Sequence, residues 1–103
     1  MRRRNTDRFG QPFLLSTVEA VWRKAQTVLG YDPNQFRKDQ CGAWIQRDQY
    51  GNTGSTRGWE IDHIRPVSKG GIDDLSNFQP LHWENNRHKG EGYPHWSCAV
   101  KAA

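Results

Sequence analysis

Residues able to do acid–base or metal chemistry concentrate between Trp59 and Gly90 of this 103-residue chain. An imidazole such as that of His63 can take up a proton near neutral pH. Carboxylate and amide oxygens, such as those of Asp62 and Asn86, are ligands that hard divalent cations prefer. In isolation, however, His63 is best interpreted as an ordinary partly buried histidine, so a functional interpretation depends on the spacing within the whole segment.

That spacing follows a pattern. The segment contains an Asp-His-Ile-x-Pro element, a Gly-Gly pair followed by Asp, an Asn-x-Gln-x-Leu element and an Asn-x-x-Lys element. In order, these are Asp62, His63, Ile64 and Pro66; Gly70, Gly71 and Asp73; Asn77, Gln79 and Leu81; and Asn86 and Lys89. The arrangement resembles the HNH (ββα-metal, His-Me finger) nuclease motif over roughly a third of the chain, with Phe78 in place of a leucine.

The resemblance implies an α+β fold, in which a short antiparallel hairpin and a helix form the core of a small single domain. It also implies a metal-dependent endonuclease that hydrolyses DNA phosphodiester bonds with one divalent cation. His63 is then the general base, and Asp62 and Asn86 are the metal ligands. Asn77 is a supporting catalytic residue that ties the intervening loop and orients the base. Mg²⁺ is the expected cation, with Mn²⁺, Ni²⁺ or Zn²⁺ as alternatives.

Two other functions stay open at this point. One is a catalytically inactive HNH-fold module that binds nucleic acid, and the other is a small structural domain whose positive charge is incidental. The joint presence of Asp62, His63, Asn77 and Asn86 argues against lost activity, because decay usually removes one such residue.

Charge favours a polyanionic partner. Fifteen Lys and Arg against eleven Asp and Glu give a net charge of +4 and a pI near 9.4, which suits DNA and, less well, RNA. Arg65, Arg87 and Lys89 are candidates to bind phosphates, although the last two fit a solvated helix face equally well. The basic run 2–4 is either a mobile arm on a DNA backbone or a solvated terminus.

The chain departs from the resemblance at the two Cys-x-x-Cys pairs that hold a structural zinc in many HNH domains. Trp44 stands where the partner of Cys41 belongs, and His82 and Asn85 occupy the second pair. We therefore expect no structural zinc, although a makeshift site remains an alternative; its members would be Cys41, His82, His95 and Cys98. His82, four residues before Asn86, is also a candidate additional ligand of the catalytic metal.

Four segments are predicted along the chain. They are a basic lead-in (1–15), an N-terminal helical segment packing on the core (16–40), the nuclease core (41–95) and a C-terminal tail (96–103). Ser16 and Glu19 form a capping box at the start of a helix whose apolar face continues to Leu29. Asp32 and Pro33 predict a second, short helical turn.

The core segment predicts a hairpin followed by a helix. Residues 40–46 favour an extended segment, and residues 59–64 alternate as a strand does. Residues 78–81 predict a second strand, in which Pro80 is suited only to an edge. Residues 83–89 predict a short helix that ends at a glycine.

No stretch has the ~20 consecutive apolar residues that a membrane span needs, and the mean hydropathy is −0.99. The two initial arginines are not followed by an apolar region, so they do not predict a signal peptide. We therefore expect a cytoplasmic protein in which Cys41 and Cys98 are free thiols. The sequence leaves monomer and dimer equally open.

Overall fold

The computed structural model describes residues 2–101. In chain order its elements are α1 (Leu15–Trp22), β1 (Phe36–Lys38), β2 (Trp44–Gln46), β3 (Trp59–His63), β4 (Phe78–His82) and α2 (Trp83–Lys89), with short 3₁₀ turns at Arg47–Gln49, Val67–Lys69 and Leu75–Asn77. The expected α+β class is confirmed. Within the described range, neither helix is long and apolar enough to cross a membrane.

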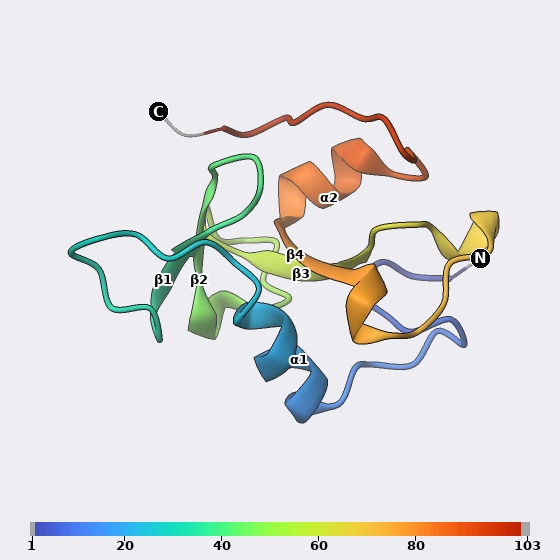
Figure 1. The fold of residues 1–103 in the computed structure, drawn as a ribbon, viewed down its shortest axis with the longest axis horizontal. Coiled ribbons are helices and arrows are strands. Elements are labelled where there is room, and N and C mark those ends of the chain that lie inside the picture. The colour runs from blue at the N-terminus through green and yellow to red at the C-terminus, as the bar shows by residue number, and fades with distance from the viewer. Residues whose placement is uncertain (1, 102–103) are drawn as a thin grey trace.

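The hairpin of β3 and β4 is the centre of the molecule (Figure 1). Its strands are antiparallel, with Trp59 opposite His82 at one end and His63 opposite Phe78 at the other. α1 packs against one side of this hairpin and α2 against the other, while β1 and β2 form a separate hairpin. Because β4 runs directly into α2, the chain forms a continuous β-β-α unit.

The pairing of Ile61 with Pro80 explains how a proline fits into this hairpin. The backbone N–H of Ile61 points away from β4 and donates to the side chain of Asn5 at 2.8 Å. Residues opposite each other in an antiparallel pair either exchange both hydrogen bonds or neither. Pro80 therefore sits where no N–H is required by the ladder, in agreement with its predicted restriction to an edge.

Aromatic and aliphatic side chains from α1 and the central hairpin form the core. Trp22 and Trp59 are 2% and 0% exposed, and their ring centroids lie 5.3 Å apart. The other buried members are Val18, Val21, Ala25, Ile45, Ile61 and Phe78. This core holds α1 against the hairpin of β3 and β4. The residues Asp62 and His63, at the end of β3, are not members of it.

The predicted start and length of α1 are wrong. The helix begins at Leu15 without a side-chain cap, and Glu19 pairs with Arg47 instead of completing a capping box. It ends at Trp22, after which Gln26 forms a bridge with Lys38. The apolar periodicity beyond Ala25 has no counterpart in packing, because Leu29 is fully exposed.

The short helical turn expected after Asp32 is present, but it is one turn only. The backbone makes a single turn, closed by a hydrogen bond of 2.8 Å from Phe36 N–H to Asp32 O, and then enters β1. Pairing with β2 requires extended backbone there, which ends the turn. The extended segment predicted within 40–46 is confirmed as β2, although it covers only Trp44–Gln46.

Cys41 and Cys98 form a disulfide, which corrects the expectation of free thiols. The bond attaches the end of the chain to the turn before β2. Asn85 of α2 holds the same tail, since its side-chain oxygen accepts hydrogen bonds from the backbone of Ala99 and Val100 at 2.8 and 2.7 Å. The disulfide also removes one support for a cytoplasmic location, because such bonds persist mainly in oxidising compartments.

Candidate active site

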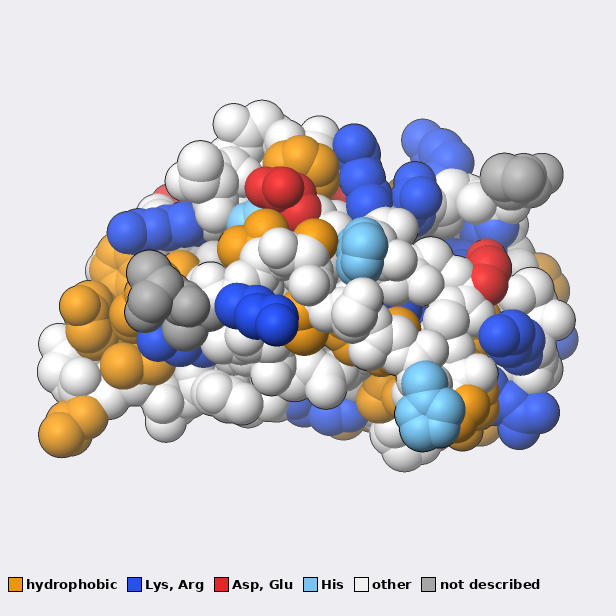
Figure 2. All heavy atoms as spheres, turned by 90° about the horizontal axis from the view of Figure 1, so that it is seen from above, with side chains coloured by type: hydrophobic (Ala, Val, Ile, Leu, Met, Phe, Trp, Pro, Cys, Tyr) orange, Lys and Arg blue, Asp and Glu red, His pale blue; other side chains and the backbone are white. Residues whose placement is uncertain are grey.

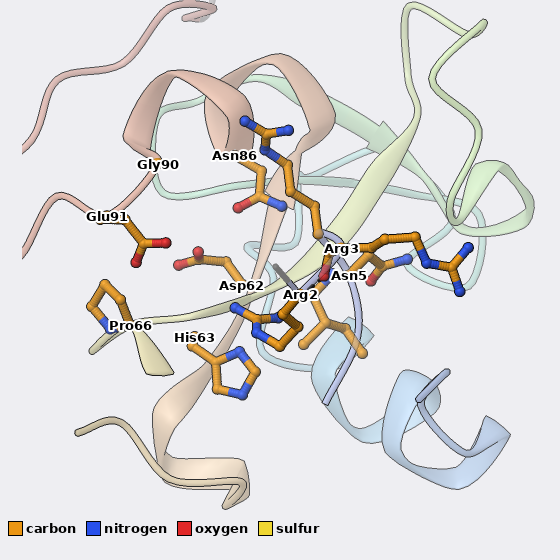
Figure 3. Close-up of a pocket in the computed structure, with 11 residues that line it drawn as sticks. Arg2, Arg3, Asn5, Asp62, His63, Pro66, Asn86, Gly90 and Glu91 are labelled. Carbon is orange, nitrogen blue, oxygen red and sulfur yellow. Dashed lines mark hydrogen bonds between the residues drawn. The ribbon is translucent and has the colours of Figure 1, made fainter. Parts of the chain in front are cut away.

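A cavity of about 470 Å³ lies at the end of β3, and three residues predicted from the sequence line it. They are Asp62 and His63, from the end of the strand, and Asn86, from α2. Figure 3 shows Asp62 and Asn86 in the middle of this site, with Pro66 and Glu91 on one side and Arg2 and Arg3 on the other. The fold thus brings these three side chains to one pocket.

Adjacent residues of a strand point to opposite faces, so Asp62 and His63 leave β3 in different directions (Figure 3). The strand remains paired through His63, opposite Phe78. Regular strand pairing therefore continues through both residues. Both side chains line the cavity because it extends around the end of the strand.

His63 is held by a carboxylate on one side of its ring. Its Nε2 lies 2.7 Å from Oδ1 of Asp73, and the ring packs edge-on against Phe78 at 5.2 Å. A carboxylate accepts hydrogen bonds, so the proton of a neutral imidazole resides on Nε2 and Nδ1 keeps its lone pair.

The free nitrogen of His63 faces the cavity. Nδ1 has no hydrogen-bond partner among the described residues. Every fully buried side-chain nitrogen or oxygen of the described residues has a partner, so Nδ1 is not fully buried. Nδ1 is therefore accessible to solvent, although His63 as a whole is 4% exposed. Figure 3 places this side of the ring toward Arg2 and Asp62. A water in the cavity can thus reach an unprotonated nitrogen.

Asp73 is itself fixed by the N-terminal segment. The backbone N–H of Arg8 donates to its Oδ2 at 3.0 Å. Burial raises the pKa of Asp73, but the hydrogen bonds from His63 and from the Arg8 backbone outweigh this effect and lower the pKa below its usual value. The carboxylate is therefore charged at neutral pH and suited to hold a protonated His63.

Asp62 is a buried carboxylate with two donors. It receives hydrogen bonds from Nε2 of Gln79 at 2.9 Å and from Nζ of Lys89, which lies 3.3 Å from Oδ1 and 3.2 Å from Oδ2. Burial raises the pKa of Asp62, while the Gln79 hydrogen bond and the Lys89 charge oppose the shift only in part. A further cation in the cavity would favour the ionised form.

Asn86 is oriented by Glu60. Its Nδ2 donates to Oε1 of Glu60 at 2.9 Å, and both side chains are buried. Because a carboxylate can only accept, this contact assigns the amide nitrogen to Glu60 and leaves Oδ1 of Asn86 for another partner. Figure 3 shows that oxygen on the side of Asp62 and Glu91.

The donor set of the cavity suits a hard divalent cation. Mg²⁺ binds oxygen, keeps several waters and needs one or two protein carboxylates. The Asp62 carboxylate and the Asn86 amide oxygen could supply such ligands, because both side chains line the same cavity. No cluster of three or more His, Cys, Asp and Glu able to hold a metal occurs within residues 2–101, so thiol- and imidazole-rich metal sites find no counterpart there.

Asn77 lies outside this cavity and holds the loop between β3 and β4. Its Oδ1 accepts from Arg65 N–H at 2.9 Å, and its Nδ2 donates to the backbone oxygens of Arg65 and Ile72 at 3.1 and 3.0 Å. Gly71 is required beside it, because a Cβ there would stand 1.7 Å from Arg65 O. The loop so tied carries His63 at one end and Asp73 near the other.

The structure does not support the sequence-based interpretation of Lys89 and His82. Lys89 is 4% exposed and donates to Asp62 and to His63 O at 3.0 Å, so it cannot reach a phosphate from the surface. Both ring nitrogens of His82 are engaged, with Thr56 O and with Glu84 N–H at 2.7 and 3.1 Å. This arrangement excludes His82 as a metal ligand and, with the disulfide, the makeshift zinc site.

The other two predicted phosphate ligands do not line the cavity either. Arg87 is exposed and stacks on Trp83, with its guanidinium carbon 4.8 Å from the ring centroid. Arg65 donates from Nε to Lys69 O at 2.6 Å and lies along the loop. Both remain surface cations near the site, and nothing in their contacts points to a phosphate.

The residues that position the predicted ones were not expected from the sequence. Asp73 belongs to the quoted pattern, so its place ten residues after His63 was a usable signal. Glu60, which orients Asn86, lies outside the quoted pattern. The approach of residues 2–5 to the cavity had no sequence signal, because it depends on the free edge of β3.

The β-β-α unit, with His63 and Asp62 on the first strand and Asn86 on the helix, has the architecture of a ββα-metal nuclease domain. Residues 47–92 match the family model described as HNH endonuclease, and this part of the chain is therefore an HNH domain. No curated protein and no solved structure matches the chain. The match to the HNH family model indicates a nuclease-like function connected with nucleic acids.

Proposed function

We propose that this protein is an endonuclease that hydrolyses DNA phosphodiester bonds, with His63 as the general base and one divalent cation held by Asp62 and Asn86. The observation that carries the proposal is the orientation of His63. Asp73 occupies Nε2, and Nδ1 opens to the cavity that Asp62 and Asn86 also line. The core of this unit is residues 41–95, to which the N-terminal and C-terminal segments are attached.

In the proposed reaction, Nδ1 of His63 accepts a proton from a water as the water oxygen attacks the phosphorus atom. The resulting imidazolium is stabilised by Asp73, whose carboxylate stays charged. The bond between phosphorus and O3′ breaks, which leaves a 5′ phosphate and a 3′ hydroxyl that takes its proton from solvent. A bound cation, Mg²⁺ in our proposal, supplies charge stabilisation for the phosphate and the departing oxygen.

A second candidate is an HNH-fold module that binds nucleic acid without cutting it. The contact between Lys89 and Asp62 favours it, because the ligand carboxylate already has a cation as partner. A carboxylate, however, has about four acceptor positions on two oxygens, and Gln79 and Lys89 use only part of them. We therefore place the nuclease first.

Nicking of supercoiled plasmid tests this choice. The purified protein is expected to convert plasmid to the open circular form with Mg²⁺ or Mn²⁺ and to leave it intact in excess EDTA. Equal cutting in chelator would contradict the cation dependence. Absence of cutting with every divalent cation tried, together with retained DNA binding, would support the second candidate instead.

A further inference from the structure

The N-terminal arm, defined here as residues 2–8, is part of the wall of the active-site cavity. Arg2, Arg3 and Arg4 line the cavity together with Asp62 and His63. Figure 3 shows Arg2 and Arg3 on the side opposite Glu91. The arm is therefore not a solvated terminus, which was one of the two interpretations that the sequence left open.

Specific hydrogen bonds hold the arm to the hairpin. Oδ1 of Asn5 accepts from the backbone N–H of Ile61 at 2.8 Å and from the hydroxyl of Tyr50 at 2.9 Å. Asn5 has a φ of 59°, a left-handed conformation that asparagine tolerates better than most residues. Burial raises the pKa of Tyr50 to about 12, so its hydroxyl remains a donor at neutral pH.

The next residues of the arm are equally well placed. Thr6 is 5% exposed, and the backbone of Arg8 donates to Asp73, the partner of His63. Arg2 contributes to the arm itself, because its guanidinium donates to Thr6 O at 2.8 Å. These contacts place the backbone of residues 2–8 at a fixed position beside the base.

Arg3 and Arg4 have no such internal role. Both side chains are exposed, and neither forms a hydrogen bond or an ion pair with the residues that the structure describes. Each offers five N–H donors in a planar fork that matches phosphate oxygens. Figure 2 views the molecule from above relative to Figure 1 and shows Lys and Arg side chains more densely on its right half. The N-terminal end lies on the right in Figure 1 as well.

A phosphate entering the cavity needs this positive charge. The cavity and its immediate surroundings contain the carboxylates of Asp62, Glu60 and Glu91, which repel an anion. Lys89 offsets one of these charges from inside the protein. The exposed guanidinium groups of the arm supply charge from the solvent side, where a nucleic-acid backbone approaches.

We propose that Arg3 and Arg4 bind the backbone phosphates next to the scissile bond, and that the N-terminal arm is thereby a phosphate-binding element of the active site. This inference rests on the proposed function, since it takes the cavity as the place where a DNA strand is cut. Contacts to phosphate carry no sequence information directly. The arm therefore contributes affinity and strand position and leaves base preference unchanged.

The test compares the double variant R3Q/R4Q with R23Q/K101Q. The control removes the same number of positive charges at exposed positions that do not line the cavity. Binding of a fluorescent DNA duplex is measured by anisotropy in EDTA between about 50 and about 200 mM KCl. R3K/R4K, which keeps both charges, completes the series.

The slope of log K against log salt is negative, and each lost phosphate contact reduces its magnitude by about 0.9. For R3Q/R4Q the magnitude of the slope is therefore expected to fall by about 1.8. Across this salt range the affinity of wild type then drops about ten-fold more than that of the variant. R23Q/K101Q and R3K/R4K are expected to keep the wild-type slope. Equal slopes for R3Q/R4Q and R23Q/K101Q, or no binding by wild type at the lowest salt, would overturn the proposal.

Plasmid cleavage separates this inference from the proposed function. A wild-type protein that does not cut, with a reduced slope for R3Q/R4Q, would contradict the nuclease and leave the arm as a phosphate-binding element. A wild-type protein that cuts, with an unchanged KM for R3Q/R4Q, would contradict the phosphate-binding role of the arm and leave the proposed nuclease function in place.

Discussion

The ammonium nitrogen of Lys89 lies 3.2 Å from a carboxylate oxygen of Asp62, and the two side chains are 0% and 7% exposed. Two residues 27 positions apart, one on α2 and one on β3, thus form a buried ion pair beside the base. The pair fixes the carboxylate proposed as a cation ligand. It also joins α2 to β3 through charge as well as through packing.

Replacing Lys89 with methionine tests this relationship. The variant keeps the aliphatic part of the side chain and leaves the Asp62 carboxylate buried without its cation. Breaking a buried ion pair in this way is expected to lower the free energy of unfolding by roughly 3–5 kcal/mol. Urea denaturation at neutral pH, followed by tryptophan fluorescence, measures the change.

The double variant K89M/D62N is the control for that experiment. It removes both charges, so much of the lost stability is expected to return. Plasmid cleavage is expected to be lost in this double variant, because D62N removes a proposed cation ligand. A double variant no more stable than K89M would show that the lysine stabilises the fold by some means other than its pairing with Asp62.

Asp73 is predicted to position His63. In Asp73→Asn, the amide can donate to Nε2, which would move the imidazole proton to Nδ1 and remove the base. Asparagine in place of a carboxylate that orients a histidine base leaves the wrong tautomer and can lower kcat by about 10⁴-fold, so we expect a large fall in kcat. KM and DNA affinity are expected to stay near wild type, as measured by plasmid kinetics and anisotropy.

Asp74→Asn provides a matched control for Asp73. Asp74 is the next residue, and its carboxylate accepts hydrogen bonds from Ser76 without contacting His63. Its loss is expected to leave kcat near the wild-type value. Equal effects of the two substitutions on kcat would assign Asp73 a role in the loop only.

The disulfide between Cys41 and Cys98 is predicted to contribute strongly to stability. The two residues are 57 positions apart, and the entropy of closing a loop of that length corresponds to about 4 kcal/mol. We expect the C41A/C98A variant to unfold at clearly lower urea concentration than the oxidised protein. Thiol titration of the denatured, unreduced protein should find no free thiol.

Reduction gives an independent check of the disulfide. Wild-type protein in dithiothreitol is expected to approach the stability of C41A/C98A, and the variant itself should not respond to the reductant. Two free thiols per chain in the purified protein, or identical unfolding curves with and without reductant, would contradict the bond.

Much of the central fold was predictable, because its signals are local. The strand at Trp59–His63, the strand at Phe78–His82 and the helix at Trp83–Lys89 follow from alternation, turns and a terminal glycine. The expected helix through residues 16–29 was too long because pairing between Gln26 and Lys38 redirects the chain. That bridge is a tertiary contact, and no periodicity in residues 16–29 contains it.

The site was predictable in its members and less so in their partners. The motif indicated Asp62, His63 and Asn86, and the structure places all three around one cavity. Lys89 pairs with Asp62 inside the protein instead of binding phosphate. The sequence did not predict this, since spacing alone does not distinguish a buried lysine from an exposed one. Disulfide formation was likewise undecidable from two distant cysteines, because it depends on how the tail returns to β2.

The most direct measurement of the central claim is cleavage and binding by His63→Ala in parallel. The variant removes the imidazole and keeps Asp62, Asn86 and the arm, so it should bind the DNA duplex with wild-type affinity and salt dependence. We predict that it leaves supercoiled plasmid uncut in Mg²⁺ under conditions in which wild type nicks it completely. Cleavage by His63→Ala at the wild-type rate would contradict the assignment of His63 as the base.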